Sequence, residues 1–250
     1  MEVNKETLVI IPVINEKENL ESLIPKILSV GSKIRVLIID DNSSDGTYEF
    51  IKGLMLKSES VIIHRRHMRL GIGSAHVTGL KYAINNDFEF CITMDGDQTH
   101  NPKYINNIYK KLIDENLDLV LTSRFIEGGG LEKWSLNRKI LTKLGHFLTK
   151  IVLRSNFDVT SGMRGYRVEN IPGSMLNWLQ NSNYEYLPMS FFFYKVNNKR
   201  IDEIPIVLPS RVYGNTKISF KLVLLNIYCI LAVRVKLFLW TSINKNKSVI

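Results

Sequence analysis

The stretch Cys91-Ile-Thr-Met-Asp95-Gly-Asp97-Gln-Thr99-His100-Asn-Pro102 leads from an apolar run to two carboxylates that a single glycine separates. The apolar run, residues 90–94, predicts a short buried strand. Ligands of open α/β sheets bind at the carboxyl ends of the strands, so we expect Asp95 and Asp97 to face a crevice. Two crowded carboxylates repel each other unless a cation holds them, and Mg²⁺ or Mn²⁺ does so while also binding phosphate oxygens. The alternative to a metal site is an Asp-Gly turn whose carboxylates are solvated, and the choice between the two depends on the surrounding sequence.

Strand-like and helix-like segments alternate on both sides of this stretch. Apolar runs at 7–12, 34–39, 61–63, 90–94 and 117–122 are separated by segments with helical periodicity. Nearly continuous apolar strands indicate a mostly parallel sheet with helices on both faces, which makes the fold class α/β. Beyond these runs we expect a flexible loop at 128–130, a long helix at 134–154, a polar loop at 160–167 and a late strand at 201–208.

Composition favours an intracellular globular protein with a substantial core. The chain has 250 residues, of which 45% are hydrophobic. Its two cysteines, Cys91 and Cys229, both lie in apolar stretches and predict core thiols in a reducing compartment. The chain opens directly into an apolar run at residue 7, so we expect no cleaved signal peptide.

The formal charge of +9 is concentrated toward the C-terminus. From residue 195 onward ten Lys/Arg oppose two Asp/Glu, a balance of +8, whereas residues 1–194 carry 23 against 22, a balance of +1. Residues 222–233 are uncharged and lie between Lys217, Lys221 and Arg234, Lys236. As a helix they would span only about 18 Å, short of the ~30 Å hydrocarbon core. We therefore expect residues 216–250 to form an amphipathic, apolar helical tail that lies on a membrane surface or against a partner.

Seven polar segments carry a resemblance to a known family. They are Pro12-Val-Ile-Asn15-Glu16, Asp40-Asp41-Asn-Ser43-Ser-Asp45-Gly46-Thr47, Gly71-Ile-Gly73-Ser-Ala75, Asp95-Gly-Asp97 with His100 and Pro102, Ser123-Arg124-Phe125, Thr160-Ser161-Gly162-Met163-Arg164 and Arg211-x-x-Gly214-x-x-Lys217. Each is weak alone, but seven in order are specific. In these residues the chain resembles the family 2 glycosyltransferases of GT-A fold, specifically their dolichyl-phosphate mannosyltransferase-like branch.

The resemblance implies a catalytic domain over residues 1–215 with a Rossmann-like, mostly parallel central sheet. It implies an inverting, metal-dependent transfer of a sugar, mannose in this branch, from a nucleotide-diphosphate sugar such as GDP-mannose or a UDP-sugar. The implied acceptor is a polyprenyl phosphate, dolichyl or undecaprenyl. Such an enzyme would lie peripherally on the cytoplasmic face of a membrane, held by the C-terminal tail or by a membrane-anchoring partner subunit, and would bind no nucleic acid.

The resemblance also implies the site residues. Those for the nucleotide sugar are Pro12, Asn15, Glu16, Asp41, Ser43, Gly71, Gly73 and Asp95. Those for Mg²⁺ or Mn²⁺ are Asp95, Asp97 and, as a weak neutral ligand, Thr99. Those for the acceptor phosphate are Arg124, Arg138, Arg211 and Lys217. Asp97, Arg124 and Arg138 are the expected catalytic residues. Asp97 would bind the metal ion beneath the donor diphosphate. The two arginines would bind phosphate, because a guanidinium fork binds phosphate oxygens bidentately and stays charged.

The acceptor and several smaller features leave alternatives open. Transfer to a sugar hydroxyl needs a general base, whereas a polyprenyl phosphate is already ionised. The nearest candidate base, Glu185, has the character of a helix-surface glutamate, and this favours the phosphate acceptor. A sugar-to-sugar transferase of surface polysaccharide assembly and a non-catalytic nucleotide- or nucleic-acid-binding module remain the alternatives. His100 either approaches the metal site or supports its loop, and the sequence does not decide between these roles.

Overall fold

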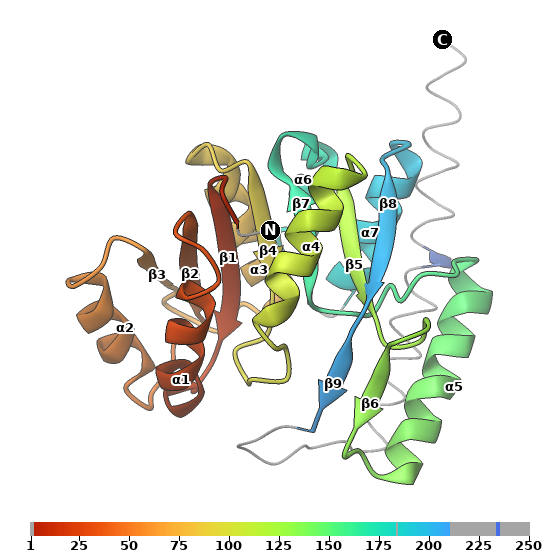
Figure 1. The fold of residues 1–250 in the computed structure, drawn as a ribbon, viewed down its shortest axis with the longest axis horizontal. Helices are drawn as coiled ribbons and strands as arrows, with labels where there is room; N and C mark the ends of the chain where they lie inside the picture. The colour runs from red at the N-terminus through yellow and green to blue at the C-terminus, as the bar shows by residue number, and fades with distance from the viewer. Residues whose placement is uncertain (1–2, 184, 211–233, 236–250) are drawn as a thin grey trace.

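A seven-stranded sheet forms the centre of the computed structural model, which describes residues 3–183, 185–210 and 234–235. The strands run in the order β3-β2-β1-β4-β7-β5-β8 (Figure 1). Their bounds are β1 (Thr7–Val13), β2 (Ile34–Asp40), β3 (Val61–Arg65), β4 (Phe90–Thr93), β5 (Leu119–Ser123), β7 (Arg164–Arg167) and β8 (Ile201–Pro205). Neighbours pair in parallel except β7, which is antiparallel to both β4 and β5.

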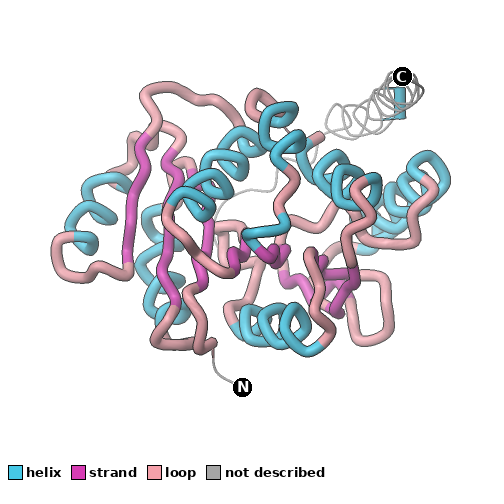
Figure 2. The backbone as a smooth tube through the Cα atoms, turned by 90° about the horizontal axis from the view of Figure 1, so that it is seen from above, coloured by secondary structure: helices cyan, strands magenta, loops and turns pink. Residues whose placement is uncertain are grey.

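Helices cover both faces of this sheet, as Figure 2 shows from above. One face packs on α1 (Lys17–Leu28), α2 (Thr47–Met55) and α4 (Lys103–Asp114), and the other on α3 (Ile72–Asn85), α6 (Gly173–Leu179) and α7 (Tyr186–Val196). Successive strand residues alternate between the two cores: Val9 and Ile11 join the first, Leu8 and Ile10 the second. Burial on both faces explains why the strands are continuous apolar runs. The predicted α/β class with helices on both faces is confirmed.

Two sequence predictions were wrong at the far side of the sheet. The polar loop expected at 160–167 contains β7, a full member of the sheet. Its Gly165 leaves room for α4, because a Cβ there would overlap Ile108 and lie 3.0 Å from Leu112 Cδ1. The single strand expected at 201–208 is divided into β8 and β9 (Val207–Pro209). Strand β9 pairs with β6 (Gly130–Glu132) in a separate two-stranded sheet. Strand β6 begins at Gly130, the last residue of the loop expected at 128–130.

Helix α5 (Leu136–Leu153) confirms the long helix expected at 134–154 and lies at the margin of the molecule, beside β6 (Figure 1). A short 3₁₀ turn, η1 (Val168–Asn170), follows β7. No helix within the described ranges is both long and apolar enough to cross a membrane. Arg211, Lys217, the boundary expected at 215–216 and all of the expected tail except Arg234 and Val235 lie outside the described residues.

Candidate active site

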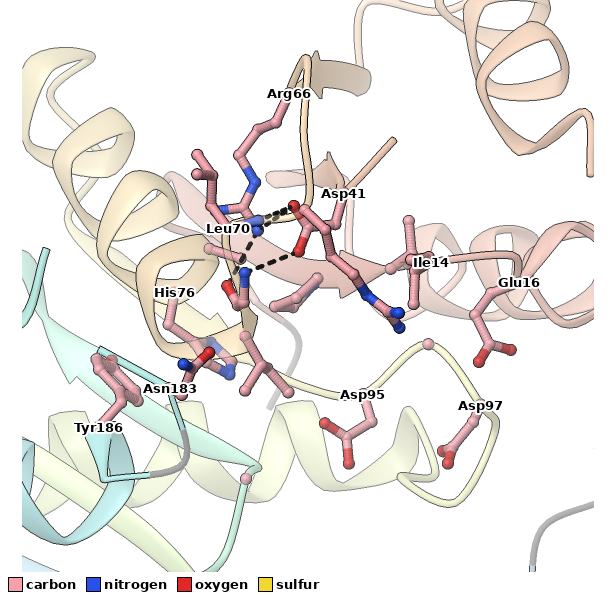
Figure 3. Close-up of a pocket in the computed structure, with 18 of the residues that line it drawn as sticks. Ile14, Glu16, Asp41, Arg66, Leu70, His76, Asp95, Asp97, Asn183 and Tyr186 are labelled. Carbon is pink, nitrogen blue, oxygen red and sulfur yellow. Dashed lines mark hydrogen bonds and ion pairs between the residues drawn. The ribbon is translucent and has the colours of Figure 1, made fainter. Parts of the chain in front are cut away.

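A pocket of about 770 Å³ opens at the carboxyl ends of β1, β2 and β4. This volume falls in the range of small-molecule sites, which is ~300–1,000 Å³. Six of the predicted nucleotide-sugar and metal residues line it, namely Pro12, Glu16, Asp41, Gly71, Asp95 and Asp97. Figure 3 labels four of them, Glu16, Asp41, Asp95 and Asp97. The structure therefore brings the ends of three strands, distant in sequence, to one cavity.

The turn after β4 holds Asp95 and Asp97 in place. Asp97 Oδ1 accepts hydrogen bonds from the Thr99 amide at 3.1 Å and the Thr99 hydroxyl at 2.6 Å. The Asp95 amide donates to His100 Nδ1 at 2.9 Å, so this nitrogen carries no proton and the imidazole is the Nε2–H tautomer. Thr99 thus orients a carboxylate, and His100, 2% exposed, supports the loop backbone.

The residues at this turn fit a divalent cation that also binds substrate. Within the described ranges no group of three or more His, Cys, Asp or Glu side chains is placed to hold a metal ion. Asp95 and Asp97 nevertheless line the same pocket. Mg²⁺ is commonly bound by one or two carboxylates with phosphates and waters supplying the other ligands. The donor set here is therefore adequate for an ion that arrives with a diphosphate.

Asp41 ties the end of β2 to the turn that starts α3. Its two carboxylate oxygens accept the amides of Leu70 and Gly71, both at 3.0 Å, and Oδ1 lies 2.8 Å from Arg66 Nη2. Gly71 has φ +90°, and a Cβ there would overlap the Asn183 side chain. Asp41 therefore shapes this wall of the pocket through the backbone of the glycine turn.

Three other predicted residues hold segments near the pocket together without lining it. The Asn15 amide donates to Ser43 Oγ at 2.9 Å, and Asn15 Oδ1 accepts the Ser44 amide at 2.8 Å, so the loops after β1 and β2 are joined. A Cβ at Gly73 would lie 2.6 Å from the Ser182 carbonyl, so glycine lets α3 approach that segment. Asn15, Ser43 and Gly73 are outside the set of described residues that line the pocket.

Arg124 and Arg138 also lie outside the described lining of the pocket. Arg124 forms a bidentate pair with Asp158, with Nε and Nη2 each 2.8 Å from a carboxylate oxygen, and Nη2 donates to Thr160 Oγ1 at 2.7 Å. Burial alone would raise the pKa of Asp158, but the guanidinium and its hydrogen bonds bring that pKa below its usual value. The Arg138 guanidinium lies 3.4 Å from the centre of the Trp134 ring.

Several pocket residues were not predicted from the sequence. They are Arg66, His76, Thr160, Asn183, Tyr186 and Leu187 among others. Arg66 lies in a basic loop that composition alone suggests is solvated, yet it is 5% exposed. One weak indication in the sequence that His76 lines the pocket is its position, about one turn into the helix that follows the glycine turn.

Two curated proteins are similar in sequence to most of this chain. The chain is 29% identical over 214 residues to the undecaprenyl-phosphate mannosyltransferase of Micrococcus luteus, covering 85% of this chain and 87% of that protein. It is 28% identical over 218 residues to the polyprenol monophosphomannose synthase of Mycolicibacterium smegmatis, covering 86% and 82%.

A crystal structure of glucosyl-3-phosphoglycerate synthase from Mycobacterium tuberculosis with Mn²⁺, uridine diphosphate and glucosyl-3-phosphoglycerate has the same fold. Its TM-score is 0.65 at 16% identity, with 93% of this chain and 80% of that chain covered. The GT-A fold expected from the sequence is confirmed. The sequence pattern described as Glycosyl transferase family 2 matches residues 8–171, and the chain belongs to this family of glycosyltransferases.

Proposed function

We propose that this glycosyltransferase transfers a mannosyl group from a nucleoside-diphosphate mannose to a polyprenyl phosphate, with inversion and with Mg²⁺ or Mn²⁺. The observation that carries the proposal is the presence of Asp95 and Asp97 in one pocket of nucleotide-sugar size. The choice of sugar and acceptor is supported by the two curated relatives, named undecaprenyl-phosphate mannosyltransferase and polyprenol monophosphomannose synthase.

The donor would lie along the pocket, with its base near Pro12, Ile14 and Asp41 and its diphosphate near Asp97. Because residue 14 is isoleucine, the base would pack against an aliphatic side chain there and would not stack on an aromatic ring. Asp95 and Asp97 would hold the metal ion together with diphosphate oxygens. When bound, the ion would neutralise charge on the departing nucleoside diphosphate.

A phosphate acceptor requires no general base from the chain, because its oxygen is ionised at neutral pH. That oxygen would attack the anomeric carbon as the bond to the diphosphate breaks, which inverts the anomeric centre. Glu185 precedes α7 and accepts the Asn183 amide at 3.2 Å. Arg124 has Nε and Nη2 committed to Asp158 and Thr160, so any contact with the acceptor phosphate falls to Nη1.

Helix α5 supports a lipid acceptor. Five of its apolar side chains recur every three or four residues and are 52–72% exposed. This apolar stripe consists of Leu136, Ile140, Leu144, Phe147 and Ile151. The helix also carries Arg138, Lys139, Lys143 and Lys150 and no Asp or Glu. An apolar stripe with flanking cations is typical of helices that lie in the interface of an anionic membrane. We propose that α5 rests on the membrane that holds the acceptor, together with residues 216–250.

Replacing Leu144 and Phe147 with serine should weaken binding to vesicles that contain anionic phosphatidylglycerol by at least about tenfold, since each apolar side chain contributes ~1.5–3 kcal/mol when fully buried. Co-sedimentation with vesicles measures the partition. Leu56→Ser is the matched control, because Leu56 is 79% exposed at the end of α2. Helix α2 lies at the opposite end of the molecule from α5 (Figure 1), so this variant should leave the partition unchanged. Equal binding by the double variant and the wild type would rule out α5 as the membrane surface.

The activity itself is tested by incubating the full chain with Mn²⁺, a polyprenyl phosphate and radiolabelled GDP-mannose or UDP-sugars. The expected product extracts into organic solvent and releases its sugar in mild acid, because a glycosyl phosphate is acid-labile. Label that enters only water-soluble saccharide would instead identify a sugar-to-sugar transferase. Donor binding without transfer to either acceptor class would contradict the proposal.

A further inference from the structure

His76 stands out among the pocket residues because its side chain is buried and its ring nitrogen Nδ1 has no hydrogen-bond partner among the described residues. It lies in the first turns of α3 and is 2% exposed. Its ring stacks on Tyr186 of α7 at 4.9 Å between centroids and 11° between planes. The Tyr186 hydroxyl lies 3.3 Å from that of Tyr166, which fixes the ring against which His76 packs. The imidazole is therefore held in one orientation at the pocket wall.

The imidazole of His76 is neutral and incompletely satisfied. Burial lowers its pKa to about 3, and the nearby positive charges of Arg164 and Arg66 act in the same direction. Its Nδ1 is buried and has no hydrogen-bond partner within the described part of the chain. Buried polar atoms in folded proteins are usually paired, and an unpaired one calls for a reason. A histidine that served only as core packing would be replaced without loss by an apolar ring.

The chemistry of the pocket differs from one side to the other. Figure 3 shows His76, Asn183 and Tyr186 grouped on one side of Asp95, with Asp97 and Glu16 on the other. The group of three presents only neutral hydrogen-bonding atoms, whereas the remainder of the wall carries Asp41, Arg66 and Arg69 as well. Neutral donors and acceptors match the hydroxyl groups of a sugar. A diphosphate would instead be drawn to the part of the pocket where a cation is held.

We propose that His76, assisted by Asn183, is the residue that selects the transferred sugar by hydrogen bonding to its hydroxyl groups. The inference rests on the proposed function, because it takes the pocket to hold a nucleotide sugar. A neutral imidazole has one donor nitrogen and one acceptor nitrogen. Because the stacked ring is held in one orientation, its hydrogen bond would reach a hydroxyl at one position of the sugar and would not reach the hydroxyl of the epimer. A site built to hydrogen-bond a substrate hydroxyl discriminates strongly against analogues that cannot satisfy it.

The test compares wild-type protein with His76→Phe, which keeps a buried ring on Tyr186 and removes both nitrogens. Calorimetry with Mn²⁺ gives the affinities for GDP, GDP-mannose and GDP-glucose, or for UDP, UDP-glucose and UDP-galactose if uracil is preferred. The affinity for the free nucleoside diphosphate should change less than about twofold. The preference for one sugar epimer over the other should fall at least about tenfold, which corresponds to the loss of about one hydrogen bond. The epimer preference in kcat/KM should fall in parallel.

Tyr194→Phe is the matched control. Tyr194 has a buried hydroxyl without a partner in the described structure, like His76, but it is outside the described lining of the pocket. It should change neither nucleotide affinity nor epimer preference. An unchanged preference in His76→Phe, or an equal loss of affinity for nucleoside diphosphate and nucleotide sugar, would overturn the assignment. Donor binding needs no acceptor, so the measured epimer preference tests the role of His76 independently of whether polyprenyl phosphate is the acceptor. A wild-type chain that binds no nucleotide sugar would overturn both proposals.

Discussion

Asp97→Asn is expected to lower the rate of sugar transfer by about 10³-fold or more and to leave the chain folded. The substitution removes one negative charge from the pocket and keeps an oxygen that can accept the Thr99 amide and hydroxyl. The expected loss corresponds to ~4 kcal/mol of transition-state stabilisation, since each 1.36 kcal/mol is tenfold in rate. Charge stabilisation by a bound metal ion is worth several kcal/mol, so loss of a carboxylate that binds the proposed ion would account for the effect.

Two measurements distinguish a metal ligand from a residue that merely shapes the turn. Donor affinity should rise with added Mn²⁺ in the wild type and respond little in Asp97→Asn, and the thermal midpoint without metal should be similar in both. Thr99→Val keeps both carboxylates and removes only the orienting hydroxyl, so its rate should fall about tenfold, as expected for one hydrogen bond to a charged group. Wild-type metal dependence of donor binding in Asp97→Asn would exclude the ligand role.

The fold was largely predictable because its strands are buried on both faces. Continuous apolar runs such as those of β1 and β2 leave little choice of structure. β7 was missed for the opposite reason: its sequence RGYR has no apolar run. It is a strand because Arg164 finds partners inside the protein and Gly165 leaves room for α4. Neither condition is visible in the local sequence.

The site was predictable to the extent that it is local. Asp95 and Asp97 follow β4 closely, so a correct prediction of this strand also predicts that the two carboxylates lie at its carboxyl end. The surroundings of Arg124 depend on a residue 34 positions away, because its partner Asp158 precedes β7. A sequence does not reveal whether an arginine at a strand end faces a ligand or a buried acid. His76 and Tyr186 meet across two helices, which again is tertiary information.

Arg164→Met is expected to destabilise the chain by about 3–5 kcal/mol, a large share of the 5–15 kcal/mol typical of domains. Arg164 is fully buried, and its guanidinium donates to the carbonyls of Val159, Ser161 and Leu187 at 2.6–2.8 Å and to Ser190 Oγ at 2.8 Å. No carboxylate lies within 4.0 Å of it among the described residues, so the cation is stabilised by neutral oxygen atoms. Methionine would fill the volume and leave those acceptors unpaired, each costing ~1–3 kcal/mol.

The same contacts connect Arg164 to the pocket. The loop 159–161 carries Thr160, and Leu187 lies in the first turn of α7; both residues line the cavity. Arg164 thus joins two walls that come from different elements. Arg164→Lys should also be strongly destabilised, because a single ammonium group cannot reach acceptors spread around a planar fork. Donor affinity should fall in both variants even at temperatures where they remain folded.

Arg167→Lys supplies the control on the same strand. Arg167 also donates to two carbonyls, those of Leu117 and Leu112, but it is only partly buried, so water can replace the lost hydrogen bonds. Its expected cost is about 1 kcal/mol. Urea unfolding followed by circular dichroism gives the free energy of unfolding for all three variants. If Arg164→Met unfolded at the same urea concentration as the wild type, the buried guanidinium would not be what holds the two pocket walls together, because its bonds would contribute no net stability.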